Sequence, residues 1–296
     1  MSDERTVSWR ELLAETEALL RSSGAGSPGV DARRIVEQVC GLEGAEWVLG
    51  LDDPATTRGV AHLDAMVARC RAGEPLQYVL GRWGFRTLDL MVDRRVLIPR
   101  PETEQVAGLA IAEALRCQGG DGTRPVTVVD LGTGSGAIAL AVAVEVPASG
   151  VWGVDRSTEA LEVARANLAG VGRPGARVRL VEGDWFDALP GELAGQVDVV
   201  VANPPYVAAS DDLPAVVDEW EPAGALVSGP TGMEDIEHIV RTSAAWLAAG
   251  GALVVELAPH QAVAALDLAV EAGLVDATVE PDLSGRLRAL VARAPG

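Results

Sequence analysis

The segment Asn203-Pro204-Pro205-Tyr206 carries residue types suited to holding a planar NH2 group. Nitrogen in an amide or an aromatic amine is a poor nucleophile because its lone pair is delocalised. Methyl transfer to it therefore needs acceptors that hold both N–H bonds and turn the lone pair toward the methyl carbon. The side-chain carbonyl of Asn203 and the backbone carbonyl of Pro204 can do this together, in a backbone that two prolines stiffen. Tyr206 can pack on the target group, so the segment predicts methyl transfer to such a nitrogen.

A glycine-rich segment, residues 130–136 (Asp-Leu-Gly-Thr-Gly-Ser-Gly), lies upstream of it. Because glycine lacks a Cβ atom and tolerates unusual dihedrals, such a loop brings the backbone close to a ligand. The helix predicted after it offers free amide groups to a polar or negative group. The pattern by itself is ambiguous: Gly132, Gly134 and Ala137 also match the dinucleotide fingerprint, and a tight turn without a ligand is a further possibility.

Two carboxylates follow predicted strands in the same half of the chain. Asp155 ends a strand at residues 151–155, and its carboxylate can accept both hydroxyls of a ribose; the alternative is a helix-capping role. Asp184 follows a strand at residues 177–181. Its carboxylate can accept from an adenine amino group while Trp185 supplies a flat apolar wall, although an isolated acidic loop residue is more often only surface.

The elements that must position these residues are short β-branched runs that alternate with helical patterns. Near-continuous apolar strands are expected where helices cover both faces of a parallel sheet, so the pattern predicts a doubly wound α/β domain. Ligands of such sheets bind beyond the carboxyl ends of the strands, where all the polar features above fall. The predicted strands are residues 126–130, 151–155, 197–202, 252–256, 275–280 and 287–292, and the predicted helices between them are 135–146, 157–169 and 233–249.

The pattern changes twice along the chain. Residues 1–80 read as a small all-α domain, which begins with a capping box formed by Ser8 and Glu11. Residues 81–99 are rich in glycine and aromatic residues, which suggests a hairpin or linker. Residues 100–296 form the α/β domain, and the candidate chemistry lies there.

Composition narrows the class of protein. The formal net charge is −19 and the chain contains no lysine, which argues against an extended phosphate-backbone partner. The three cysteines and three histidines are scattered without metal-ligand spacing, so we expect no metal site. No long apolar stretch predicts a membrane span, and no signal peptide is recognised. We therefore expect a cytoplasmic protein that acts on a protein or a small molecule.

These motifs resemble the HemK/PrmC family, the protein-(glutamine-N5) methyltransferases of class I peptide chain release factors. The resemblance covers nearly the whole chain. It includes the motifs discussed above and four further segments: residues 73–81 (Gly-Glu-Pro-Leu-Gln-Tyr-Val-Leu-Gly), 96–104 (Val-Leu-Ile-Pro-Arg-Pro-Glu-Thr-Glu), Glu221-Pro222 and 282–286 (Asp-Leu-Ser-Gly-Arg). Residues 231–233 (Thr-Gly-Met) replace the expected Asp-Gly-Leu, and the N-terminal domain diverges most.

The resemblance implies a class I S-adenosylmethionine-dependent methyltransferase fold, with a mostly parallel seven-stranded sheet and a helical N-terminal domain that helps to grip the release factor. The target would be the glutamine of the factor's Gly-Gly-Gln motif, held by residues 203–206. The loop at residues 100–104 would lie near the cleft. The cofactor would contact Gly132, Thr133, Gly134, Ser135, Gly136, Asp155, Asp184, Trp185 and Asn203.

Three other functions remain open. An adenine-N6 methyltransferase of nucleic acid would use the same glycine loop and the same Asn203 to Tyr206 segment, but a flipped base needs a surface that holds phosphates. A nicotinamide oxidoreductase would leave the Asn203 segment without a use. A non-catalytic interaction domain would show no cofactor-dependent turnover.

Overall fold

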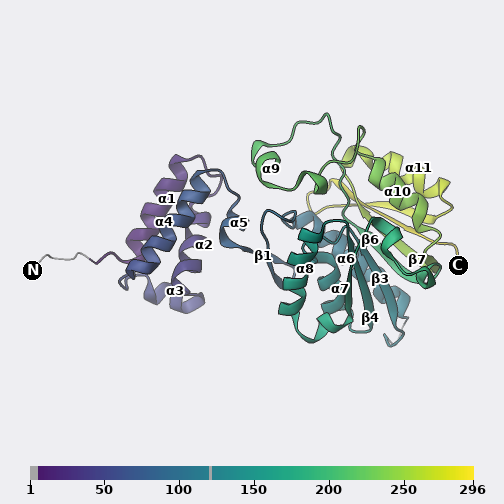
Figure 1. The fold of residues 1–296 in the computed structure, drawn as a ribbon, viewed down its shortest axis with the longest axis horizontal. Helices are drawn as coiled ribbons and strands as arrows, with labels where there is room; N and C mark the ends of the chain where they lie inside the picture. The colour runs from purple at the N-terminus through teal and green to yellow at the C-terminus, as the bar shows by residue number, and fades with distance from the viewer. Residues whose placement is uncertain (1–5, 120–121) are drawn as a thin grey trace, which may run out of the picture. The chain divides into compact units, whose positions relative to one another are not determined.

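The computed structural model describes residues 6–119 and 122–296, and the chain divides between Gly81 and Arg82 into two compact units (Figure 1). Each unit has its own hydrophobic core. Among the described residues, no helix combines the length and the apolar character needed to cross a membrane.

The N-terminal unit is built from short amphipathic helices. Its first helix begins with the predicted capping box, in which Ser8 and Glu11 exchange side-chain and backbone hydrogen bonds. Apolar side chains spaced along α1, α2 and α4 then share one core, which includes Leu12, Ile35 and Leu63. The helices are α1 (Trp9–Ser22), α2 (Pro28–Cys40), α3 (Gly44–Gly50), α4 (Thr57–Arg71) and α5 (Leu76–Leu80).

The second unit contains the predicted mostly parallel, seven-stranded sheet, so the expected fold class is confirmed. The strand order is β5-β4-β3-β6-β7-β9-β8, and β9 runs antiparallel to the two strands that flank it, β7 and β8. The chain order reverses between β3 and β6, which is where ligands of open α/β sheets bind. The strands are β3 (Val126–Leu131), β4 (Ser149–Asp155), β5 (Val178–Glu182), β6 (Val197–Ala202), β7 (Leu247–Glu256), β8 (Val275–Pro281) and β9 (Leu287–Arg293).

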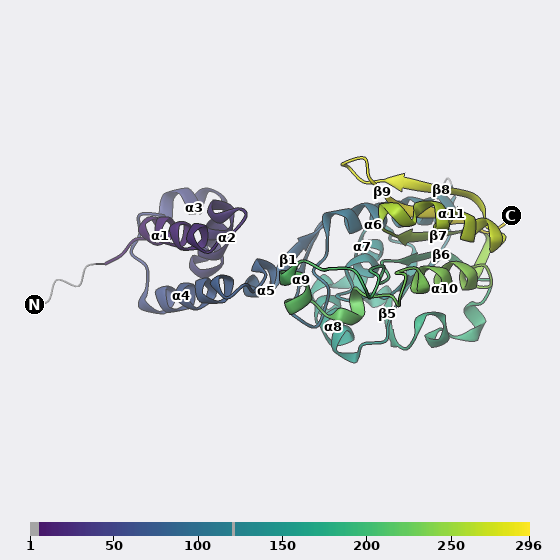
Figure 2. The ribbon, with the colours of Figure 1, turned by 90° about the horizontal axis from the view of Figure 1, so that it is seen from above.

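Helices cover both faces of this sheet (Figures 1 and 2). Successive strand residues point to opposite faces: Val128 belongs to the core under α6 and α7, whereas Val129 belongs to the core under α10 and α11. Burial on both faces explains why the strands are almost continuously apolar. The helices of this unit are α6 (Pro101–Gln118), α7 (Ala137–Glu145), α8 (Thr158–Val171), α9 (Ala215–Trp220), α10 (Glu234–Ser243) and α11 (Ala262–Glu271).

Two local predictions have different outcomes. The hairpin expected within residues 81–99 is present as β1 (Arg82–Phe85) and β2 (Leu88–Met91). The helix predicted over residues 233–249 is too long, because α10 ends at Ser243 and β7 begins at Leu247. Pairing of Leu247 with Val197 on the neighbouring strand β6 supplies backbone hydrogen bonds that a continued helix would forgo.

Candidate functional site

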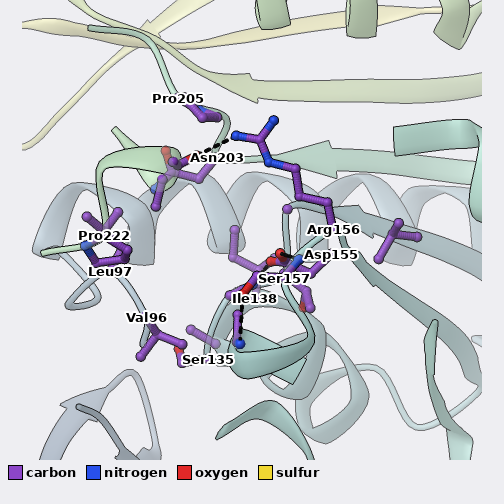
Figure 3. A pocket seen from close by; sticks show the side chains of 18 of the residues that line it. Val96, Leu97, Ser135, Ile138, Asp155, Arg156, Ser157, Asn203, Pro205 and Pro222 are labelled. Carbon is purple, nitrogen blue, oxygen red and sulfur yellow. Dashed lines mark hydrogen bonds between the residues drawn. The ribbon is translucent and has the colours of Figure 1, made fainter. Parts of the chain in front are cut away.

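A pocket lies at the carboxyl ends of β3, β4 and β6, at the point where the strand order reverses (Figure 3). It combines a polar rim with apolar walls, as ligand sites do. Most of the residues predicted from the sequence line it: Gly132, Thr133, Gly134, Ser135, Asp155, Asp184, Trp185, Asn203 and Pro205. Gly136, Pro204 and Tyr206 are not among the lining residues.

The glycine-rich loop forms one wall of the pocket. Gly132, Gly134 and Gly136 all have φ between 55° and 83°, a left-handed region that other residues rarely adopt. The loop is held from below by Asp130, whose carboxylate accepts from the Thr133 hydroxyl at 2.6 Å and from the Ala139 amide at 3.1 Å. Burial raises the pKa of Asp130 to about 7. Gly136 supports this wall as the N-cap of α7 instead of facing the pocket.

Asp155, the last residue of β4, faces the same pocket. One of its carboxylate oxygens accepts from the Gly134 amide at 2.8 Å and the other from the Ser157 amide at 2.9 Å. Burial raises the pKa of this carboxyl group, while the two backbone donors act in the opposite direction. Each carboxylate oxygen keeps a further lone pair, so the group can still accept from a pair of hydroxyls.

The loop after β5 contributes Asp184 and Trp185. Trp185 has a φ of 43°, which is unusual for a residue with a side chain and is typical of functional sites. Its ring lies close to the glycine loop: a Cβ atom added at Gly132 would lie 3.4 Å from it. Asp184 lines the pocket but is exposed, so its carboxylate is accessible both to solvent and to a molecule in the pocket.

The segment from Asn203 to Tyr206 leaves β6 beside the glycine loop, where a Cβ atom added at Gly132 would lie 3.9 Å from the backbone oxygen of Asn203. Figure 3 shows Asn203 and Pro205 on the opposite side of the pocket from Ser135 and Ile138. Pro204 is buried. Tyr206 packs against the core under α10 and α11, and its hydroxyl donates to Glu256 over 3.4 Å. Burial raises the pKa of this phenol to about 12, so it stays protonated at neutral pH.

Neighbouring loops hold this segment in place. The backbone amides of Tyr206 and Val207 both donate to the carbonyl of Leu226, at 3.2 and 3.0 Å. The side-chain amide of Gln261 donates to the carbonyls of Tyr206 and Gly232, each at 2.9 Å. These bonds add to the stiffness of the two prolines, so the segment is preorganised.

The mouth of the pocket is formed by segments outside the strand ends. The chain before α6 contributes the lining residues Arg95, Val96, Leu97 and Pro99. Glu221 holds this segment, because it accepts from the Ile98 amide at 3.1 Å and pairs with Arg100. Arg156 reaches over the pocket from the end of β4, toward the side that holds Asn203 (Figure 3), and donates to the Gly224 carbonyl at 3.0 Å.

Residues 100–104 were expected to form a loop near the cleft, but α6 begins at Pro101, so residues 101–104 are its first turn. Sequence reasoning singled out neither Thr103 nor Glu256, and both contact the Asn203 segment. Thr103, in the first turn of α6, accepts from the Asn203 side-chain nitrogen at 3.1 Å and donates to Glu256 at 2.8 Å. Glu256 is the last residue of β7 and is 1% exposed. The sequence contains a pattern by which Glu256 could have been identified, because it follows an apolar run. It ends a strand next to β6, just as Asp155 ends a strand next to β3.

Family models match segments of both units of the chain, and curated relatives match nearly all of it. A family model described as "PrmC N-terminal domain" matches residues 11–81, and one described as "Methyltransferase small domain" matches residues 114–221. A release factor glutamine methyltransferase of Streptomyces coelicolor is 40% identical over 95% of this chain and 96% of its own length. The protein of that name from Burkholderia pseudomallei is 38% identical over 96% and 97%.

A solved structure shares the fold. The crystal structure of a methyltransferase from Pyrococcus furiosus matches with a TM-score of 0.51 and 17% sequence identity, over 81% of this chain and all of the other. At that level of identity the likeness concerns the fold alone.

Proposed function

This chain belongs to the release factor glutamine methyltransferase family, and we propose that it methylates the side-chain amide nitrogen of the glutamine in the Gly-Gly-Gln motif of class I peptide chain release factors. The observation that carries the proposal is the position of Asn203, whose side chain lines the pocket beside the glycine loop. An amide acceptor at that point suits an NH2 group presented to a methyl donor. The reaction would belong to translation termination, and we therefore place it in the cytoplasm.

The pocket fits S-adenosylmethionine as the methyl donor. In this proposal Asp155 would accept the two ribose hydroxyls, and Trp185, Ile138 and Val154, which line the pocket, would supply apolar surface for a flat base. Gly132 lies against the Trp185 ring, and its φ of 71° is one that a residue with a side chain rarely adopts. Asp184 would accept from the adenine amino group. When bound, the donor supplies an electrophilic methyl group on a sulfonium.

The chain's own part in the reaction is to orient the target nitrogen. The side-chain carbonyl of Asn203 and the backbone carbonyl of Pro204 would accept the two N–H bonds of the target amide. Pro205 and the buttressing of Tyr206 by Leu226 keep these acceptors from moving. Because such alignment can supply up to about 7–11 kcal/mol of a barrier, no strong general base is required. Tyr206 would contribute its ring rather than its hydroxyl.

The helical N-terminal unit is proposed to bind the release factor. The PrmC N-terminal domain model matches residues 11–81, which extend one residue past the end of α5, and the core of this unit is separate from that of the catalytic unit. A unit with its own core can present its outer helix faces to a partner. The large negative charge of the chain supports a protein partner over an extended nucleic acid.

The direct test is to incubate the protein with a class I release factor and S-adenosylmethionine and to locate the added methyl group by mass spectrometry. We expect one added methyl group, on the glutamine of the Gly-Gly-Gln motif, and none on a factor in which that glutamine is alanine. Methyl incorporation into DNA or RNA, with none into the factor, would replace the proposal with the adenine-N6 alternative.

A further inference from the structure

A buried carboxylate lies behind the pocket and is not used by the chemistry above. Glu256 ends β7, directly beside β6, which leads into Asn203. Its side chain accepts from the Thr103 hydroxyl at 2.8 Å through one oxygen and from the Tyr206 hydroxyl at 3.4 Å through the other. A buried carboxylate is costly to keep, so its retention here calls for a reason.

The hydroxyl of Thr103 links this carboxylate to Asn203. Thr103 is only 4% exposed, which leaves its hydroxyl few choices of partner. Its one proton points to Glu256, so its lone pairs are left to accept, and the side-chain nitrogen of Asn203 lies 3.1 Å away. The direction of each hydrogen bond therefore follows from the carboxylate, which in its ionised form can only accept.

This direction matters because the two ends of an asparagine side chain have the same shape and opposite hydrogen-bonding roles. With its nitrogen committed to Thr103, Asn203 is left with its carbonyl oxygen for the target group. Rotation of the amide by half a turn would put an NH2 group against the NH2 group of the target, and would also place an oxygen against the lone pairs of the Thr103 hydroxyl. The amide therefore needs an anchor behind it.

We propose that Glu256 and Thr103 are positioning residues that hold the side-chain amide of Asn203 with its oxygen toward the target nitrogen. The proposal rests on the proposed function, since it assigns the anchor of that same acceptor. Glu256 also receives the hydroxyl of Tyr206, so one carboxylate orients both the first and the last residue of the Asn203 to Tyr206 segment.

The protonation state of Glu256 should therefore affect the rate. Burial raises the pKa of this carboxyl group to about 7, with Arg288 acting to lower the pKa and Glu102 to raise it, and with Thr103 and Tyr206 donating to it. Below that pH the protonated acid can itself donate to Thr103, and the hydroxyl is then free to turn toward Asn203. The kcat should accordingly fall as the pH drops below about 7.

The hydroxyl is tested with a pair of variants of matched size. Thr103→Val keeps the shape of the side chain and removes the hydroxyl, whereas Thr103→Ser keeps the hydroxyl. We expect Thr103→Val to lower kcat by about 10- to 100-fold, the range expected for the loss of a hydrogen bond to a charged group. The Kd for S-adenosylmethionine should change by less than about threefold, and Thr103→Ser should regain most of kcat.

Two further measurements separate positioning from simple damage. Thr242→Val, near the end of α10 and outside the pocket lining, is the matched control and should keep the wild-type kcat. Glu256→Gln, which cannot titrate, should lose the fall of kcat near pH 7; this variant decides the matter if Thr103→Val does not fold. Thermal melts of all four variants identify any that are unfolded.

The outcomes are distinct. Wild-type kcat in Thr103→Val, or a folded Thr103→Ser as slow as Thr103→Val, would overturn the anchor, as would an unchanged pH profile in Glu256→Gln. If the wild-type protein does not methylate the release factor, that result contradicts the proposed function itself, before any variant is compared.

Discussion

The carboxylate of Asp155 accepts a hydrogen bond of 2.8 Å from the backbone amide of Gly134, a residue 21 positions earlier in the chain. The bond joins the end of β4 to the glycine loop that follows β3, so two neighbouring strand ends are locked together at the pocket. The same carboxylate therefore shapes the loop and lines the pocket, so we expect its loss to weaken cofactor binding.

We expect Asp155→Ala to weaken S-adenosylmethionine binding by about 10- to 100-fold, because the ribose hydroxyls and the Gly134 amide both lose a charged acceptor. Titration calorimetry measures the change directly. Asp187→Ala is a suitable control, since Asp187 is exposed and lies outside the pocket lining. Equal affinities for Asp155→Ala and wild type would refute the ribose assignment.

Asn203→Ala should lower kcat by about 100- to 1000-fold, the usual effect of removing one preorganised polar group from a reacting centre. Cofactor binding should be reduced but measurable, because the glycine loop and Asp155 remain. Single-turnover methylation of a release factor, followed beside calorimetry, separates the two effects. Wild-type turnover by this variant would remove Asn203 from the mechanism.

Arg100→Met should destabilise the catalytic unit by about 2 kcal/mol, because it leaves the Glu221 carboxylate buried without its cation; the partial exposure of Arg100 limits the loss. Replacing both partners, as Arg100→Met with Glu221→Gln, should recover part of that free energy of unfolding. Urea denaturation of the two variants tests this, and a double variant less stable than Arg100→Met would contradict it.

Asp130 should make the free energy of unfolding depend on pH. Burial raises its pKa to about 7 in the folded protein, against about 4 in an unfolded chain. The folded state thus holds a proton that the unfolded state has already released, so the stability contribution is present at low pH and is lost as the pH rises from about 4 through 7.

An asparagine at this position cannot titrate, so the free energy of unfolding of Asp130→Asn should vary less with pH than that of the wild type. Between pH 5 and 8 we expect the two changes to differ by about 1–3 kcal/mol. Urea denaturation at several pH values gives the comparison. Asp187→Asn serves as the exposed control and should keep the wild-type pH dependence. A parallel pH dependence for Asp130→Asn and wild type would show that this carboxyl group does not titrate in the way its burial implies.

The amino-acid sequence by itself determined the features that depend on short-range patterns. Runs of β-branched residues indicate strands buried on both faces, and the closely spaced glycines of residues 130–136 adopt the φ values that only glycine adopts readily. Asn203 directly follows β6, Asp155 is the last residue of β4, and Trp185 comes shortly after the end of β5. Their shared pocket could be anticipated because the carboxyl ends of parallel strands meet at one edge of a sheet.

Only the tertiary structure decided which distant residues stand behind the acceptor. Thr103 lies 100 positions before Asn203 and 153 before Glu256. No local pattern records such a contact, because it arises from the order in which strands pair and from where α6 crosses the sheet. The end of α10 also depends on a tertiary contact, because Leu247 pairs with Val197 on β6 and so belongs to a strand. Thr103 on α6 and Glu256 on β7 lie near Asn203 because of where these elements pack and where the side chains point, and their residue types alone do not predict it.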